Sequence, residues 1–181
     1  DDAAPVVYAH IDTAHDDDVP AFEPMIRRWL DLDADPGAVG SVLGADPLLA
    51  PLVERRPGLR VPGSTSWFDT AVQTVIGQQV GVGAACTFTA RLVAAYGDPA
   101  PQGLNCFPLP HTLAAADPDE LRAAVGLTRS RARTVQVLAR AVVDGLDPAL
   151  PDFRAGLSAL PGIGPWTVEY LALRGCGDRD A

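Results

Sequence analysis

A glycine-rich turn lies between two apolar segments in the string Leu160-Pro161-Gly162-Ile163-Gly164-Pro165-Trp166-Thr167. The apolar runs Phe153 to Ala159 and Val168 to Leu173 flank it, which predicts a helix, a tight hairpin and a second helix. Gly162 and Gly164 can both adopt positive φ, and neither has a Cβ to block an approaching group. Because the first N–H groups of a helix have no acceptor within it, this turn could hold a phosphate by backbone alone. An αα-hairpin without a ligand is the alternative.

Trp166 and Tyr170 are four residues apart, so they share a face of the second predicted helix. Two aromatic rings just after an anion-binding turn could form the wall of a pocket for a flat, electron-poor ligand. Judged from spacing alone, packing of both rings in the protein core is the commoner outcome.

A second polar feature, Ile76-Gly77-Gln78-Gln79-Val80, lies where one predicted helix ends and the next begins. Two adjacent amide side chains at such a point could enter a nucleic-acid duplex and bond to a base. A polar turn between helices with no ligand is the commoner role of Gly-Gln-Gln.

These segments together resemble the helix-hairpin-helix element of the DNA glycosylase superfamily, and in particular the AlkA-type 3-methyladenine (alkylpurine) DNA glycosylases. The resemblance covers most of the chain from about Asp31 onward. It implies a mainly α fold, the helix-hairpin-helix glycosylase fold, in which two helical lobes surround a cleft. Besides the hairpin string and Ile76 to Val80, the residues that carry it are Tyr170, Leu171-Ala172-Leu173-Arg174-Gly175, Asn105-Cys106-Phe107-Pro108 and Leu113-Ala114-Ala115-Ala116-Asp117-Pro118.

The resemblance implies base excision repair by a glycosylase that removes alkylated purines such as 3-methyladenine through hydrolysis of the N-glycosidic bond. Trp166 and Tyr170 would then line the base pocket, because a cationic alkylated purine stacks well on such rings. The family places a wedge, often leucine, at the position of Gln79, and the polar residue here makes a weaker apolar plug. The implied DNA-binding residues are Leu160, Gly162, Ile163, Gly164 and Thr167 in the hairpin, with Gln78 and Gln79 in the inter-helix turn.

All fourteen basic residues are arginines, and the chain contains no lysine. A Schiff base needs a lysine amine or an N-terminal amine. Strand-cleaving relatives carry a lysine directly after the hairpin, where this chain has Trp166. The resemblance therefore implies a monofunctional enzyme without lyase activity.

The catalytic group implied by the family is an aspartate, since a carboxylate can stabilise an oxocarbenium-like sugar or activate water. The family places it a few residues after the second hairpin helix. Asp180 matches an earlier acidic position and Asp178 matches none, so we expect the catalytic aspartate just past Ala181 and assign no catalytic residue within this chain. The chain as given would then be inactive by itself.

Few other residues suggest a cofactor. His10, His15 and His111 lack ligand spacing, and no Cys-x-x-Cys is present, so no metal site is expected. The resemblance implies at most a monovalent cation held by backbone carbonyls of the hairpin. Three scattered cysteines and no leader segment indicate a cytoplasmic protein of bacterial type, with no membrane.

The predicted organisation has three parts. Val6 to Ile11 is expected to be a residual N-terminal β-strand, so residues 1–15 are interpreted as the remnant of a truncated α/β domain. Residues 16–60 are assigned to part of the first helical lobe. Residues 61–181 are assigned to the helix-hairpin-helix lobe, whose C-terminal remainder is expected to be absent.

The net charge of −9 argues against nucleic acid as a partner, since nucleic-acid-binding domains are usually basic. The charge is uneven, however: four arginines and no acid lie between Thr128 and Arg140, although a solvated helix face is the commoner meaning of such a run. The expected partner is double-stranded DNA with alkylated bases, bound by a monomer. A non-catalytic helix-hairpin-helix DNA-binding module and a helical protein-interaction domain remain as alternatives.

Overall fold

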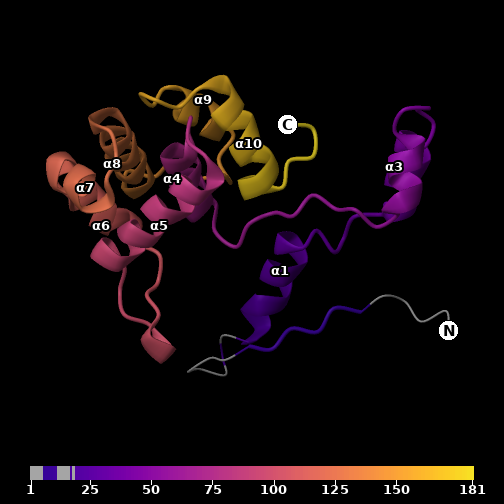
Figure 1. The fold of residues 1–181 in the computed structure, drawn as a ribbon, viewed down its shortest axis with the longest axis horizontal. Helices are drawn as coiled ribbons and strands as arrows, with labels where there is room; N and C mark the ends of the chain where they lie inside the picture. The colour runs from indigo at the N-terminus through magenta and orange to yellow at the C-terminus, as the bar shows by residue number, and fades with distance from the viewer. Residues whose placement is uncertain (1–5, 12–16, 18) are drawn as a thin grey trace. The chain divides into compact units, whose positions relative to one another are not determined.

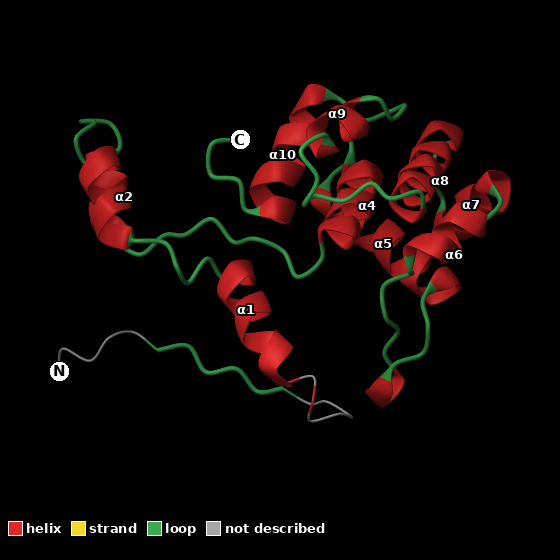
Figure 2. Cartoon of the chain, turned by 180° about the vertical axis from the view of Figure 1, so that it is seen from behind, coloured by secondary structure: helices red, strands yellow, loops and turns green. Residues whose placement is uncertain are grey.

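The computed structural model describes residues 6–11, 17 and 19–181 and confirms a mainly α fold (Figures 1 and 2). Among these residues, no helix has the length and apolarity needed to cross a membrane. The elements are α1 (Val19–Trp29), α2 (Pro36–Leu43), α3 (Ala50–Arg55), α4 (Trp67–Gly77), α5 (Val82–Tyr96), the 3-10 turn η2 (Pro101–Gly103), α6 (Pro110–Ala115), α7 (Pro118–Val125), α8 (Arg129–Val143), α9 (Phe153–Ser158) and α10 (Pro165–Cys176).

The expected strand over residues 6–11 is wrong: the structure describes this segment without strand pairing. Among the described residues, the β-type pairing is a single isolated bridge between Pro99 and Asn105. A β-branched sequence favours extended backbone, but a strand also needs a neighbour to take up its N–H and C=O groups. His15, one of the scattered histidines, lies outside the described residues.

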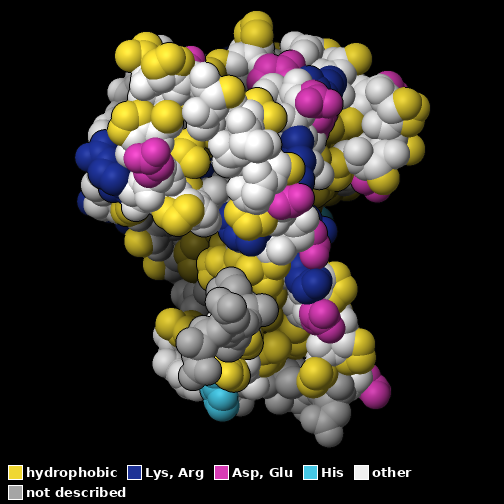
Figure 3. Space-filling view, turned by 90° about the vertical axis from the view of Figure 1, so that its right-hand side faces the viewer, with side chains coloured by type: hydrophobic (Ala, Val, Ile, Leu, Met, Phe, Trp, Pro, Cys, Tyr) yellow, Lys and Arg dark blue, Asp and Glu magenta, His cyan; other side chains and the backbone are white. Residues whose placement is uncertain are grey.

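The chain divides into two compact units, Asp1–Arg60 and Val61–Ala181. In the first unit α2 packs against α3, and none of its described residues is buried. The Arg60 guanidinium donates to the carbonyls of Asp31 and Ala34, which ties the end of this unit to the turn after α1. Large apolar side chains such as Leu48 remain exposed, and Figure 3 shows hydrophobic side chains interspersed with charged ones on one face.

The second unit contains the hydrophobic core. Helix α4 packs against α5, α8 and α10, while α8 also packs against α6 and α7, and α9 packs against α10. Each of several helices contributes a fully buried aliphatic side chain, and such burial stabilises the fold by about 1.5–3 kcal/mol per residue. Examples are Ile76, Leu92, Leu121, Leu138, Leu157 and Leu171.

Side-chain caps mark the starts of α4, α7 and α8 in this unit. The Ser66 hydroxyl accepts the Asp69 N–H at 3.2 Å at the start of α4, and the Thr128 hydroxyl accepts the Arg131 N–H at 3.3 Å at the start of α8. Gly126, with φ +88°, ends α7 just before this second cap. The resulting start of α8 places Arg131 and the following turn of the helix beside the hairpin.

Candidate nucleic-acid interface

The predicted helix, hairpin and helix correspond to α9, the turn at residues 159–164, and α10. Gly162 has φ +86°, and the Ile163 N–H donates to the Leu160 carbonyl at 3.1 Å, which closes the turn. The Ile163 side chain is buried in the core, as is that of Thr167. Of these two predicted DNA-binding residues, only the backbone groups therefore remain for a ligand.

Of the two glycines that can adopt positive φ, only Gly162 does so, and Gly164 does not. Its φ is −94°, as the N-cap of α10 requires. A Cβ built at Gly164 would meet no atom within 4 Å. What glycine provides at this position is therefore open space at the start of the helix.

Several backbone N–H groups at the start of α10 are unused. Among the described residues, those of Gly164, Trp166 and Thr167 donate to no acceptor, whereas the Val168 N–H donates to the Gly164 carbonyl at 3.1 Å. The N-terminal end of a helix also carries a partial positive charge. Free N–H groups, a favourable dipole and the absence of a side chain at Gly164 together make a site that an anion can enter.

One side chain from α8 and one from the turn after α4 hold the hairpin in place. The Thr134 hydroxyl lies 3.0 Å from the Pro161 carbonyl and 3.1 Å from the Ser130 carbonyl, both of which are acceptors for its single proton. The Gln78 amide donates from Nε2 to the Gly162 carbonyl at 3.1 Å. The Arg131 guanidinium donates in turn to the Gln78 carbonyl. The turn after α4 and the hairpin are therefore linked through α8.

An open groove of about 800 Å³ runs between α4, α5 and α10. It brings together four predicted site residues, Gln78, Gln79, Trp166 and Tyr170, which lie at opposite ends of the second unit's sequence. No acidic or basic side chain is among its lining residues, which otherwise are Thr70, Gln73, Thr74, Gly77, Val80, Val82, Ala85, Cys86, Thr89 and Ala90.

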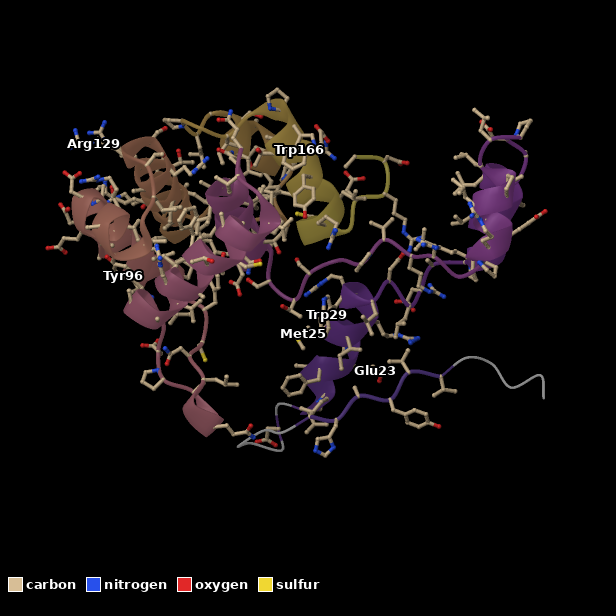
Figure 4. All side chains as sticks on the ribbon, viewed as in Figure 1. Glu23, Met25, Trp29, Tyr96, Arg129 and Trp166 are labelled. Carbon is tan, nitrogen blue, oxygen red and sulfur yellow. The ribbon has the colours of Figure 1, made fainter. Side chains whose placement is uncertain are left out.

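The two aromatic rings of the groove stack on each other. The ring centroids of Trp166 and Tyr170 are 5.0 Å apart and the planes are inclined by 16°. Trp166 remains 67% exposed on α10 (Figure 4), so the ring face turned away from Tyr170 is open. The Arg174 guanidinium lies 5.8 Å from the centroid of Tyr170. Because Tyr170 already contacts an indole and a cation, the available stacking surface is the outer face of Trp166.

The two glutamines, which sequence reasoning treated alike, have different environments. Gln78 is half-buried and bonded to the hairpin, whereas Gln79 is exposed and has a left-handed backbone with φ +55°. Such a conformation is uncommon for a residue other than glycine and occurs often at functional turns. Gln79 is thus the residue that can reach a ligand, and Gln78 supports the turn that carries it.

Sequence reasoning missed three residues of this site. Arg131 and Thr134 hold the hairpin and the turn after α4, and Arg154 holds the segment after α10 by bonding Glu169 and Asp178. No motif marks them. The only sequence signal was the unexplained concentration of arginines after Thr128, of which Arg131 proves to be directed inward.

Asp178 and Asp180, near the end of the chain, are exposed and lie outside the groove. The Asp180 N–H and then the Arg154 guanidinium lower the pKa of Asp178 below its usual 3.8, because both favour the charged carboxylate. Asp178 is therefore an ionised partner of Arg154 that secures the turn after α10.

The monovalent cation that the resemblance implies would bind hairpin carbonyls, and these carbonyls already accept hydrogen bonds. Those of Leu160, Pro161 and Gly162 already accept hydrogen bonds from Ile163, Thr134 and Gln78, respectively. Each of these oxygens keeps a second lone pair, so a cation would share them with the donors. Among the described residues there is also no cluster of His, Cys, Asp and Glu suited to a metal ion.

Comparisons with known proteins agree with this geometry. Residues 72–178 match the family model of the HhH-GPD superfamily base excision DNA repair proteins, and residues 1–66 match that of the AlkA N-terminal domain. The chain is 43% identical over 164 residues to the probable bifunctional transcriptional activator/DNA repair enzyme AlkA of Mycobacterium tuberculosis. It is 40% identical over 163 residues to DNA-3-methyladenine glycosylase 2 of Escherichia coli.

These alignments cover 86% of this chain but only 32% and 55% of the two relatives, so the chain spans about half of their lengths or less. A solved structure, the 3-methyladenine DNA-glycosylase from Archaeoglobus fulgidus, superposes with a TM-score of 0.74 at 23% identity. It covers 91% of this chain and 59% of that one, and this likeness shows the fold. On the match of residues 72–178, this chain belongs to the HhH-GPD superfamily of base excision DNA repair proteins.

Proposed function

We propose that the protein is a monofunctional DNA glycosylase that hydrolyses the N-glycosidic bond of alkylated purines such as 3-methyladenine in double-stranded DNA. The observation that carries the proposal is the groove in which Gln79, Trp166 and Tyr170 meet beside a hairpin with free N–H groups. The names of the two relatives, a DNA repair enzyme and a DNA-3-methyladenine glycosylase, support it.

In this proposal each part of the site has a separate task. The N–H groups of Gly164 and Thr167 hold one phosphate, which fixes the duplex without reading its sequence. A base inside a duplex must be flipped out before it can be excised, at a cost of a few kcal/mol. Gln79 enters the vacated space, while the flipped base stacks on Trp166 and recovers about 1–3 kcal/mol.

Selectivity for alkylated purines would come from charge. These lesions are cationic, and a cation over the face of a tryptophan gains about 0.5–2 kcal/mol, depending on desolvation. Arg174 already occupies the corresponding position over Tyr170. Trp166, with its outer face open, is therefore the ring on which a cationic base would be distinguished from a normal one.

The absence of lysine from the sequence supports hydrolysis without strand cleavage, because a Schiff base requires an amine. The proposal makes double-stranded DNA with alkylated bases the partner of a monomeric protein acting in the cytoplasm. The alternative function that an experiment must exclude is a DNA-binding module without catalytic activity.

The proposed activity is tested by measuring base release with the full-length protein. We expect it to liberate 3-methyladenine from methylated duplex DNA, and Trp166→Ala to lower kcat/KM by about 5- to 150-fold, the equivalent of the stacking energy. Trp166→Phe should retain most of the activity. Trp29→Ala, which removes a similarly exposed tryptophan from the first unit, is the matched control. Duplex binding without base release would establish the docking module instead.

The hairpin is tested separately by affinity for a duplex containing an abasic site. Gly164→Ala adds a methyl group in open space where the phosphate would lie, so we expect affinity to fall about tenfold, or about 1.4 kcal/mol. Gly58→Ala also adds a methyl group in open space, far along the chain from the hairpin, and should leave affinity unchanged. Equal affinities for the two variants would contradict the backbone phosphate site.

A further inference from the structure

Three arginines form a stripe along α8 that the site described above does not use. Arg129, Arg133 and Arg140 are spaced so that a helix of 3.6 residues per turn places them within about 40° of arc. Between the first and the last, the helix rises about 16 Å. Arg129 projects from the N-terminal end of α8 (Figure 4). The sequence run is therefore one face of a helix carrying three positive charges in a row.

This stripe borders a second groove, of about 690 Å³, whose lining does not include Gln78. Helix α8 supplies most of the lining, and Pro161 and Gly162 of the hairpin and Pro118 at the start of α7 also line the groove. The remaining lining residues are Ser130, Thr134, Gln136 and Val137. A chain that contacts the hairpin can thus continue directly along the arginines.

The charges in this groove are only partly neutralised. No lining residue is acidic. Within the described part of the chain, the ion-pair partner of these arginines is Asp119, which is shared between Arg129 at 3.4 Å and Arg122 at 3.6 Å. Arg140 donates through Nε to the Ala114 carbonyl at 3.2 Å, so its terminal nitrogens remain available. Among the described residues, Arg133 has no ion-pair or hydrogen-bond partner.

The floor of the groove is held rigid by buried polar groups. Gln136 donates from Nε2 to the Ala116 carbonyl at 2.5 Å, and the Thr134 hydroxyl contacts the Pro161 carbonyl at 3.0 Å. Both side chains are buried. A surface that is already ordered loses less entropy when a ligand binds, so the arginines are presented by a preorganised support.

We propose that this arginine groove binds consecutive backbone phosphates of the DNA strand that passes the hairpin. The proposal rests on the DNA binding proposed above and adds a second contact surface to it. Three charges spread over about 16 Å match an extended polyanion better than a single phosphate. A DNA strand is such a polyanion, with a phosphate about every 3.4 Å along the helix axis. With no aromatic residue in its lining, the groove would contribute affinity without sequence preference.

The salt dependence of DNA affinity tests this surface, measured with the full-length protein and a duplex containing an abasic site. Each phosphate contact adds about 0.9 to the slope of log affinity against log salt. We expect Arg133→Ala to reduce the slope by about 0.9, so that the affinity ratio between about 50 and about 200 mM salt falls by roughly 3-fold. Arg133 holds no other residue, which leaves the fold intact. Arg133→Lys keeps the charge and should keep the slope.

Arg122→Ala is the matched control, because it removes the same charge from an exposed arginine outside the groove. If Arg133→Ala and Arg122→Ala change the slope equally, the groove proposal is overturned while DNA binding stands. If the wild-type protein shows no salt-dependent affinity for the duplex, the proposed function itself fails. A triple substitution of Arg129, Arg133 and Arg140 by alanine that lowers the slope further than Arg133→Ala, together with a triple lysine substitution that restores it, supports the groove.

Discussion

Replacing Gly162 with alanine should destabilise the fold through two separate costs. Gly162 has φ +86°, a backbone conformation that alanine adopts at a cost of about 1–2 kcal/mol. An added Cβ would also lie 2.2 Å from Thr134 Oγ1 and 3.1 Å from its Cγ2, and relieving such crowding costs about 1–3 kcal/mol. We therefore expect the free energy of unfolding to fall by about 2–5 kcal/mol.

A double-mutant cycle with Thr134→Ala separates the two costs. That substitution removes both of the crowding atoms and leaves the Thr134 Cβ, 3.2 Å away, as the nearest. In the Thr134→Ala background, Gly162→Ala retains the backbone cost and loses most of the steric cost. The expected coupling free energy is therefore about 1–3 kcal/mol, measured by urea unfolding of the four proteins followed by far-ultraviolet circular dichroism.

Gly164→Ala is the internal control for stability. Its φ of −94° suits alanine, and no atom lies within 4 Å of the added Cβ, so the free energy of unfolding should change by no more than about 0.5 kcal/mol. If the costs of Gly162→Ala and Thr134→Ala simply add, the steric argument is refuted. If Gly162→Ala is as stable as the wild type, the backbone argument fails as well.

Three further predictions concern the helical unit. Asp117→Ala removes the side-chain oxygen that accepts two backbone N–H groups at 2.8 and 3.0 Å at the start of α7. The free energy of unfolding, measured with urea, should fall by about 0.5–2 kcal/mol, and an unchanged urea midpoint would argue against the cap. Leu138→Ala, at a fully buried site, should lower the free energy of unfolding by about 2–5 kcal/mol. Val143→Ala, at an exposed site on the same helix, should lower it far less, and similar losses for the two variants would contradict the assigned core. Because the pKa of Asp178 is lowered, its contribution to stability is present above the ordinary pKa of 3.8 and is lost as pH falls through the lower folded value. An NMR titration of its carboxyl carbon should give a midpoint below 3.8 that rises in Arg154→Ala, and a midpoint at 3.8 in the wild type would refute this.

The helices of the second unit could be predicted closely because their signals are local. In the sequence an apolar run followed by Gly97 predicts a helix from about Val82 to Tyr96, and α5 has those bounds. Thr128, a residue type that favours the N-cap position, predicts the start of the next helix, and its hydroxyl accepts the Arg131 N–H. An N-cap and a stop signal act within one turn of helix, so their effect can be seen in a short stretch of sequence.

Features that depend on a distant partner could not be predicted in this way. The expected strand at residues 6–11 has suitable β-branched residues but no paired neighbour in the structure. The separate roles of Gln78 and Gln79 depend on a carbonyl 84 residues away and on the guanidinium of Arg131, 53 residues away. Helical spacing predicted that Trp166 and Tyr170 share a face of the helix. It did not predict that the two rings stack on each other and leave only the outer face of Trp166 open.

The acidic net charge, which argued against DNA as a partner, is weaker evidence once it is assigned to the two units. Residues 1–60 hold twelve acidic residues and five arginines, whereas residues 61–181 hold eleven and nine, so most of the charge of −9 lies outside the unit with the hairpin. The hairpin site uses backbone N–H groups and needs no basic side chain. The arginines of α8 then supply positive charge where a bound strand would continue. Local fields act over about one Debye length, near 10 Å at moderate salt, so docking depends on these groups more than on the total charge.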